Sequence, residues 1–193
     1  GGGTASLMPA RAINSVIRRI TTLAPGAPSR EVTLECEPGT VATARLAQVK
    51  SGGVNRISVC AQALDDSTLR DIKRLHNTRD VLNLVDSVVQ AGFRNIHLDL
   101  IYGLPEQTRS SWIACLRKAI KLPFVHISAY KFYTYRHGNF HRTGRSVPMP
   151  SVGDEILSRS ALMLRDAQEI LGAAGFIQYS LTEFAKPGCE SSY

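Results

Sequence analysis

The sequence lacks clustered cysteines. Its 193 residues include Cys36, Cys60, Cys115 and Cys189, and no two of these form a CxxC or CxxxCxxC spacing. Such isolated cysteines exclude a dense disulfide framework and a cysteine metal knuckle. The same pattern indicates a reducing compartment.

Long apolar runs, a signal peptide, internal repeats and low-complexity segments are also absent. No run approaches the roughly 20 apolar residues of a membrane span, so we predict no membrane span. The chain opens on Gly-Gly-Gly-Thr without a methionine. From this start we expect a fragment or processed product with a further segment upstream.

The charge is uneven but not concentrated. Lys and Arg number 23 against 16 Asp and Glu, a net charge of +7. A basic surface favours nucleic acid, anionic lipid or an acidic small molecule as partner. No run of Lys and Arg is interleaved with aromatic residues, so we do not expect a nucleic-acid partner. With 44% hydrophobic residues, we expect residues 1–193 to form a single domain.

Short apolar strands alternate with longer helical patterns along the chain. We expect strands at 31–40, 55–62, 95–105, 125–132 and 178–184, and helices at 9–23, 40–50, 65–75, 79–91, 110–121 and 154–174. A helix between successive strands predicts parallel strands with right-handed crossovers, so the predicted fold class is α/β.

Within the strands, apolar and polar residues alternate. Leu34, Ile57 and Leu98 share the apolar face with their neighbours two residues away, whereas Glu35, Ser58 and Asp99 lie on the other face. A parallel sheet covered on both faces would be apolar throughout. The alternation therefore predicts a barrel or partly closed sheet whose interior holds a polar ligand. An open antiparallel sheet facing water is the alternative, and the intervening helices argue against it.

Four polar residues are candidates for contacting that ligand. Glu35, Gln62 and Asp99 fall at or near the carboxyl ends of successive strands, where parallel barrels bind ligands. A carboxylate such as Asp99 in an apolar strand is costly to bury unless donors or a ligand meet it. Arg74 could pair with a carboxylate, the alternative being an exposed helix arginine. The opening glycines could cradle an anion with their N–H groups or form only a tight connection.

Several motifs together carry a family resemblance. GGGTAS, LECEPGT, GVNRISVCAQALDD, KRLH, AGFRNIHLDLIYGLPEQT, HISAY and FAKPGCES follow one another in this order. In these motifs the chain resembles radical S-adenosylmethionine (SAM) proteins, specifically the oxygen-independent coproporphyrinogen III oxidase family and its heme-chaperone-like branch. The resemblance covers nearly the whole chain.

The resemblance implies a partial parallel (β/α)6 barrel of the TIM-like, radical SAM type, truncated at its N-terminus here. Such a barrel holds S-adenosylmethionine and a [4Fe–4S] cluster at its open end. The matching positions imply seven contacts to the S-adenosylmethionine. They are Gly2, Gly3 and Thr4 on the methionine moiety, Glu35 at its amino group, and Gln62, Arg74 and Asp99 elsewhere, Asp99 on a ribose hydroxyl.

The chain also departs from the family. The cluster-binding CxxxCxxC is absent, no cysteine here matches a ligand position, and we therefore predict no metal ligand in this chain. Ala5 replaces a proline, Glu183 an asparagine and Tyr193 a histidine, and Tyr135 stands where the family has an acid. We also expect the chain to stop before the family's carboxyl-terminal domain. These changes affect the substrate side more than the cofactor side.

Three functions stay open. The first is a radical SAM oxidoreductase that, at full length, oxidatively decarboxylates coproporphyrinogen III, this fragment alone being inactive. The second is a heme-binding chaperone that passes heme to a receiving protein, and the third is a non-catalytic relative. The expected partner is therefore a porphyrin or heme, and the expected compartment is the cytoplasm or, in a eukaryote, the mitochondrial matrix.

Histidines outside the predicted cofactor site have two interpretations. His137 and His141, in a basic loop with Arg136, Arg142 and Arg145, could bind heme iron and its propionates, or the loop is simply solvated. His97 and His126 are expected to be core histidines with satisfied hydrogen bonds. We expect Trp112, Phe93 and Phe176 to pack in the core.

Overall fold

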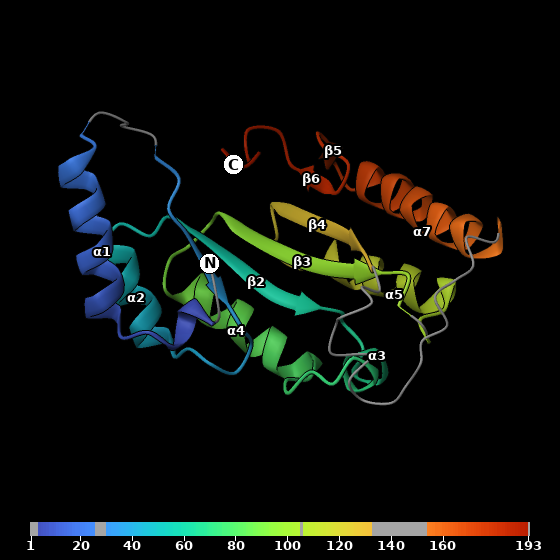
Figure 1. Ribbon diagram of the computed structural model, residues 1–193, viewed down its shortest axis with the longest axis horizontal. Coiled ribbons are helices and arrows are strands. Elements are labelled where there is room, and N and C mark those ends of the chain that lie inside the picture. Colours follow the sequence, from blue (N-terminus) through green and yellow to red (C-terminus); the bar gives the residue numbers. More distant parts are fainter. Residues whose placement is uncertain (1–3, 26–29, 105, 133–153, 193) are drawn as a thin grey trace.

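A computed structural model describes residues 4–25, 30–104, 106–132 and 154–192 (Figure 1). Six strands form one sheet in the order β1-β2-β3-β4-β6-β5. The strands are β1 (Thr33–Cys36), β2 (Arg56–Gln62), β3 (Ile96–Tyr102), β4 (His126–Lys131), β5 (Ile177–Gln178) and β6 (Glu183–Ala185). The helices are η1 (Ala5–Leu7), α1 (Ala10–Leu23), α2 (Thr43–Ser51), α3 (Asp66–Asp71), α4 (Thr78–Gln90), α5 (Arg109–Ala119) and α7 (Asp154–Ala173).

The first four strands are parallel to one another. β1 pairs with β2, β2 with β3 and β3 with β4, always in the parallel sense. The helices between them supply the crossover connections that parallel pairing requires. The α/β prediction is confirmed, and the alternative of an open antiparallel sheet is wrong.

The last part of the sheet differs from the prediction. The single strand expected at 178–184 is wrong, because β5 and β6 form an antiparallel pair and β6 lies antiparallel to β4. A turn interrupts the segment: Gln178 Nε2 donates to the carbonyl of Leu181 at 3.0 Å, and the amide of Tyr179 donates to the carbonyl of Glu183 at 3.1 Å. The chain therefore folds back on itself, and Glu183 arrives beside β4.

The core lies between the apolar face of the sheet and the helices, which Figure 1 shows running alongside it. Trp112, Phe93 and Phe176 are buried there, as predicted. Trp112 also donates from Nε1 to the carbonyl of Met163 at 2.8 Å, which joins α5 to α7. A buried indole N–H needs such a partner.

Helix boundaries follow local hydrogen bonding. Asn77 begins α4 with a capping box, in which its side chain accepts from the amide of Asp80 and its own amide donates to the Asp80 carboxylate. Asn77 is therefore the N-cap of α4, and the helix begins one residue before the predicted 79–91. α3 is shorter than the predicted 65–75, because Lys73 has a φ of 56°, which an α-helix does not accommodate.

None of the helices in the described ranges is long and apolar enough to cross a bilayer.

Candidate functional site

The polar face of the sheet carries a continuous set of hydrogen-bonding side chains. Strand pairing sets Glu35 beside Ser58, Ser58 beside His97 and Asp99 beside Ser128. Because side chains alternate across a strand, these residues share one face, opposite the apolar core. The alternation predicted from the sequence therefore positions the site.

Asp99 is the central acid of this face. Its Oδ2 accepts a hydrogen bond from Ser58 Oγ at 2.8 Å, and its Oδ1 lies 3.4 Å from His97 Nε2. Burial raises the pKa of Asp99 to about 6, and the nearby carboxylates of Glu183 and Glu35 add to that rise, while the Ser58 hydrogen bond opposes it. Carboxyl groups with a raised pKa are common at functional sites.

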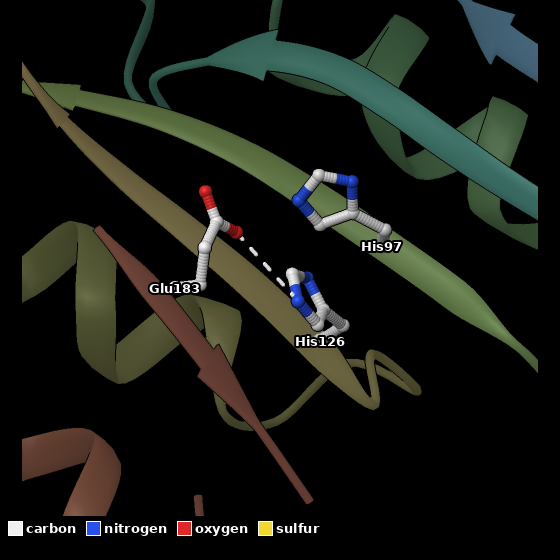
Figure 2. A group of neighbouring side chains, drawn as sticks. All are labelled: His97, His126 and Glu183. Carbon is white, nitrogen blue, oxygen red and sulfur yellow. Dashed lines mark ion pairs between the residues drawn. The ribbon is translucent and has the colours of Figure 1, made fainter. Parts of the chain in front are cut away.

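His97 and His126 face each other across β3 and β4, with ring centroids 4.5 Å apart (Figure 2). Burial, with His126 and Arg56 acting in the same direction, lowers the pKa of His97 well below 6.5. Burial also lowers the pKa of His126 to about 4, helped by Arg56 and opposed by Glu183. Both imidazoles are therefore neutral at pH 7, and their contacts with carboxylates are not ion pairs.

Glu183 reaches the two histidines from β6. Its Oε2 lies 3.6 Å from His126 Nε2 and accepts a hydrogen bond from Ser128 Oγ, and its Oε1 accepts from Thr182 Oγ1 at 3.0 Å. Ser128 Oγ is also 2.6 Å from His97 Nε2. Ser128 thus connects the acid of the last strand to the histidine of β3.

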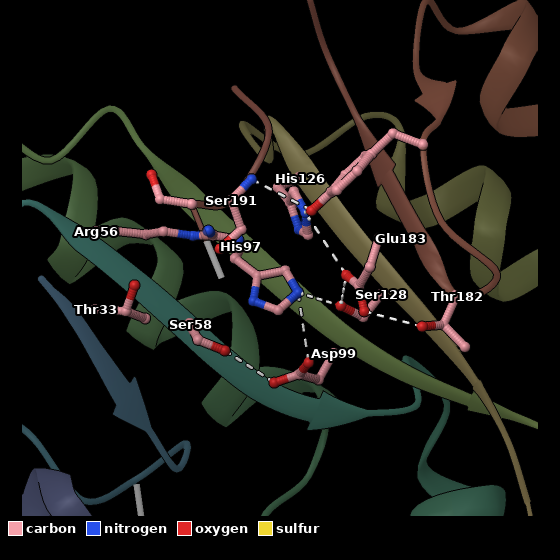
Figure 3. Close-up of polar contacts among 12 residues, drawn as sticks. Thr33, Arg56, Ser58, His97, Asp99, His126, Ser128, Thr182, Glu183 and Ser191 are labelled. Carbon is pink, nitrogen blue, oxygen red and sulfur yellow. Dashed lines mark hydrogen bonds and ion pairs between the residues drawn. The ribbon is translucent and has the colours of Figure 1, made fainter. Parts of the chain in front are cut away.

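A second set of contacts spans the sheet near the amino ends of its strands (Figure 3). Arg56, almost fully buried, donates from Nη1 to both carboxylate oxygens of Glu31 at 3.0 Å. Glu31 also accepts from Ser191 Oγ at 3.0 Å and from the amide of Ser192 at 3.2 Å. Tyr179, whose hydroxyl lies 2.6 Å from His126 Nε2, accepts from the amide of Ser191 at 3.2 Å. The contacts therefore connect the first strand to the end of the chain.

At the carboxyl end of β1, the turn that follows the opening glycines is fixed in place. Thr4 precedes η1 and accepts from the amide of Leu7. Ser6 is buried, contacts Thr40 Oγ1 at 2.7 Å and accepts from the amide of Glu37 at 3.4 Å. Thr4 therefore lies near the strand ends where the sequence predicts a ligand. Gly2 and Gly3 lie outside the described residues.

Gln62 and Arg74 line one pocket at the carboxyl end of β2. The pocket has a volume of about 320 Å³ and is otherwise lined by Ile72, Ile101, Leu104 and Phe132. Gln62 has a φ of 66°, and the pairing of β2 with β3 is irregular between Val59 and Gln62. Positive φ is uncommon for residues other than glycine, and such residues are enriched at ligand sites.

Arg74 also has a protein partner. Its Nη2 lies 3.5 Å from Glu37 Oε1, which is 3.2 Å from His76 Nδ1 as well. Its buried Nε has no hydrogen-bond partner among the described residues. A ligand carboxylate beside this guanidinium would complete its hydrogen bonding.

The structure thus brings the predicted residues together in two groups. Glu35 is close enough to Asp99 to influence its pKa, and Gln62 and Arg74 share a pocket. The sequence interpretation missed Arg56, Tyr179 and the contact of Glu183 with the histidines. Arg56 could have been found, because it follows the even-numbered alternation of β2. The loop candidates Arg136, His137, His141, Arg142 and Arg145 lie outside the described residues.

The expected satisfaction of the two histidines is only partly correct. Both are buried and both Nε2 atoms have partners, but His126 Nδ1 is buried without a hydrogen-bond partner in the described structure.

The cysteines do not fit an iron–sulfur cluster. All four are free, and Cys36 and Cys115 are buried in the core. The described residues do not bring three cysteines within ligating distance of a common centre. Cluster iron is held by cysteine thiolates, and the CxxxCxxC motif of the family supplies three, so the cluster ligands are not found among the described residues.

Fold and site together define an α/β protein with a parallel-dominated sheet whose polar face and carboxyl-end pocket can hold a ligand. Residues 1–119 match the radical SAM superfamily, and the chain belongs to that superfamily.

Relatives extend the match over nearly the whole chain. It is 33% identical over 192 residues to the heme chaperone HemW of Synechocystis, covering 97% of this chain and 45% of that protein. It is 30% identical to HemW of Escherichia coli, over 100% of this chain and 49% of the relative. A bovine mitochondrial protein, radical S-adenosyl methionine domain-containing protein 1, is 30% identical over 100% of this chain and 43% of its own length. The chain therefore spans about half the length of the curated relatives it matches.

The fold also matches a solved structure. Coproporphyrinogen III oxidase (HemN) from Escherichia coli, titled a radical SAM enzyme, superposes with a TM-score of 0.82 at 22% identity, over 97% of this chain and 42% of that chain. The predicted barrel class of the radical SAM type is confirmed by this match.

Proposed function

We propose that this chain binds S-adenosylmethionine at the carboxyl ends of β1, β2 and β3, within a longer radical SAM protein that handles heme. The observation that carries the heme part is the similarity to HemW heme chaperones along almost the entire chain, at 30–33% identity. The compartment, cytoplasm or mitochondrial matrix, is a prediction that goes with this proposal.

The side chains suit the chemical groups of S-adenosylmethionine. The exposed carboxylate of Glu35 would accept from its ammonium, and Asp99 would accept from a ribose hydroxyl. Arg74 would donate to its carboxylate, because a guanidinium matches a carboxylate in a two-point contact. Gln62 would use its amide in the same pocket, and Gly2, Gly3 and Thr4 would approach the methionine moiety.

In this proposal the protein supplies binding and orientation. The sulfonium of bound S-adenosylmethionine supplies a cleavable carbon–sulfur bond. The described residues do not provide ligands for the iron–sulfur cluster. The polar residues named above would hold the cofactor. The apolar side chains of Ile72, Ile101 and Leu104, which line the same pocket, would exclude water.

The cofactor assignment is tested at Asp99. In the full-length, cluster-reconstituted protein, Asp99→Ala is expected to abolish S-adenosylmethionine binding measured by calorimetry, because it removes the acceptor for the ribose. Asp86→Ala removes an exposed carboxylate from α4 and should bind as the parent does. Parent-like binding by a folded Asp99→Ala protein would refute the assignment.

Heme handling is tested separately from cofactor binding. The anaerobically reconstituted full-length protein is expected to bind heme stably and to leave coproporphyrinogen III unchanged. Formation of protoporphyrinogen would instead establish the decarboxylase predicted as the first of the three functions. If neither heme binding nor turnover occurs while S-adenosylmethionine still binds, the heme proposal fails and the cofactor assignment stands.

A further inference from the structure

A histidine pair and an acid from three different strands converge on the polar face. His97 comes from β3, His126 from β4 and Glu183 from β6, and one ligating atom of each lies within 4.8 Å of the other two. Figure 2 shows the three side chains directed toward one another. His97 and His126 are buried, and the Glu183 side chain is 19% exposed. No other group of three such side chains meets these limits in the described parts of the chain.

The three side chains form a donor set suited to a transition metal. Two imidazoles and one carboxylate are a common protein ligand set for Zn²⁺, which binds nitrogen and oxygen at about 2.0–2.2 Å. Tetrahedral ligands at that bond length lie roughly 3.4 Å apart. His126 Nε2 and Glu183 Oε2, 3.6 Å apart, are already near this separation. The remaining separations are within 4.8 Å, so the side chains would have to move closer together to bind an ion.

The hydrogen bonding of His126 is incomplete among the described residues. His126 is 1% exposed, and Tyr179 approaches its Nε2 while its Nδ1 has no hydrogen-bond partner among the described residues. Whichever nitrogen carries the proton, one polar atom of this buried ring is unsatisfied. A metal ion bound at Nε2 would not reach Nδ1, so the observation that supports the site is the convergence of the three ligating atoms.

Hydroxyl groups surround the three side chains and suit the outer shell of a metal site. Ser128 Oγ contacts both His97 Nε2 and Glu183 Oε2, and Thr182 Oγ1 fixes the other oxygen of Glu183. Outer hydrogen bonds of this type orient metal ligands and are important for affinity. Because the Ser128 hydroxyl donates to Glu183, His97 Nε2 donates to Ser128 Oγ, and its proton would move to Nδ1 when Nε2 binds the ion. Rotation of the Tyr179 hydroxyl would free His126 Nε2.

The group adjoins the proposed cofactor site but uses different side chains. His97 and His126 are register partners, whereas the Asp99 and Ser128 pair lies two residues further toward the carboxyl ends of the same strands. Gln62 and Arg74 line a pocket that contains none of the three side chains. Glu183 pairs with Ser128 and so lies in the same row as Asp99, and Asp99 Oδ1 lies 3.4 Å from His97 Nε2. A metal ion held by the three side chains would therefore lie beside the proposed S-adenosylmethionine site, at atoms of its own.

We propose that His97, His126 and Glu183 bind one divalent transition-metal ion, Zn²⁺ being the ion their donor set fits best. The site needs no cysteine and no cluster, so it does not depend on the proposed function. Nitrogen and carboxylate ligands also bind Co²⁺, whose visible absorption spectrum depends on its coordination geometry.

The test uses Co²⁺ and Zn²⁺ directly. The protein, treated with chelator and kept without cluster reconstitution, is titrated with Co²⁺ and then with Zn²⁺. One Co²⁺ per chain should give the visible absorption of a low-coordinate cobalt site, and one Zn²⁺ should displace it. His97→Asn and the nearly isosteric Glu183→Gln should each weaken binding at least about tenfold.

The sequence has five histidines, and the three outside the proposed site serve as controls. His76→Asn alters a buried histidine that also contacts a carboxylate, Glu37, and should leave the cobalt absorption intact. The double variant His137→Asn/His141→Asn removes the loop histidines and should also leave it intact. Circular dichroism and thermal melting establish that each variant is folded.

Several outcomes would overturn the proposal. It fails if the parent protein gives no cobalt absorption, or if the absorption persists in folded Glu183→Gln and His97→Asn proteins. It also fails if the loop double variant abolishes the absorption, because the ion would then be bound by His137 and His141.

Discussion

Burial sets the reactivity of the cysteines. Burial raises the pKa of Cys36 and of Cys115 to about 12. The pKa of Cys60 also rises to about 12, through burial first and then through the carboxylates of Asp99 and Glu35. A thiol with that pKa is ionised in only about 1 in 10⁴ molecules at pH 8, and the thiolate is the reactive form.

We therefore expect Cys189 to be alkylated first by iodoacetamide at pH 8. It lies near the end of the described chain and is only partly buried, while Cys36, Cys60 and Cys115 should react far more slowly. Peptide mass spectrometry over a time course measures the four rates. In strong denaturant the rates should become similar, and alkylation of Cys36 or Cys115 as fast as Cys189 in the folded protein would contradict the burial described here.

At the same scale, the sequence predicted the polar face but not all of its members. Glu35 and Asp99 could be assigned to one face because side chains in a strand alternate with a period of two. The contact of Glu183 with His126 could not, because it depends on a turn that reverses the chain before β6. A four-residue turn (179–182) between two very short strands leaves no periodic pattern to read.

The loop that follows β3 shows how a single side chain fixes an element. Gln107 Oε1 accepts from the amide of Gly103 at 2.8 Å and from that of Leu104 at 3.4 Å. Its Nε2 donates to the carbonyl of Ile101 at 3.1 Å, and the whole residue is only 3% exposed. Gly103 has a φ of 78°, a conformation that glycine adopts without strain. The Gln107 side chain thus holds the backbone in place where the chain leaves the strand that carries Asp99.

Removing the hydrogen bonds of the Gln107 side chain should destabilise the fold. Gln107→Ala leaves buried backbone donors and an acceptor without partners, and we expect a loss of about 2 kcal/mol in the free energy of unfolding. Gln90→Ala, at the exposed end of α4, should change it by less than about 0.5 kcal/mol. Urea denaturation measures both values, and equal stability of the two variants would show that the Gln107 hydrogen bonds contribute nothing.

Among the elements, those with a repeated pattern were predicted well. The four parallel strands and the helices between them follow from alternation, caps and glycine stops, because each of these signals is local. No local signal gives the direction of β6, because it depends on which strands β6 pairs with in the sheet. For that reason the parallel part of the sheet was predicted correctly and its last edge was not.

On the scale of the whole molecule, Glu31, which precedes β1, connects the segment before the first strand to Ser191 and Ser192. It accepts two hydrogen bonds from Arg56 and one each from Ser191 and Ser192, about 160 residues away in sequence. Burial is the largest influence on the pKa of Glu31 and raises it. The hydrogen bonds from Thr33 and Ser192, together with Arg56, outweigh burial, so the net pKa is below 4.5.

Removing the charge of Glu31 should therefore cost stability in a pH-dependent way. Glu31→Gln leaves the buried guanidinium of Arg56 uncompensated, and we expect a loss of about 3 kcal/mol at pH 7. Because the pKa of Glu31 is lowered on folding, its contribution is complete above the unfolded-state pKa and is lost as pH falls through the lower folded-state value. The difference between parent and variant should accordingly shrink below about pH 4.5.

The matched control is a glutamate that pairs with an arginine in solvent. Glu169 lies 3.0 Å from Arg165 on α7, and both side chains are largely exposed. Glu169→Gln should change the free energy of unfolding by less than about 0.5 kcal/mol at any pH, because exposed pairs contribute little. Urea denaturation of both variants at pH 7 and pH 4 separates the two cases. A pH-independent loss in Glu31→Gln would mean that its packing, and not its charge, holds the chain end against the first strand.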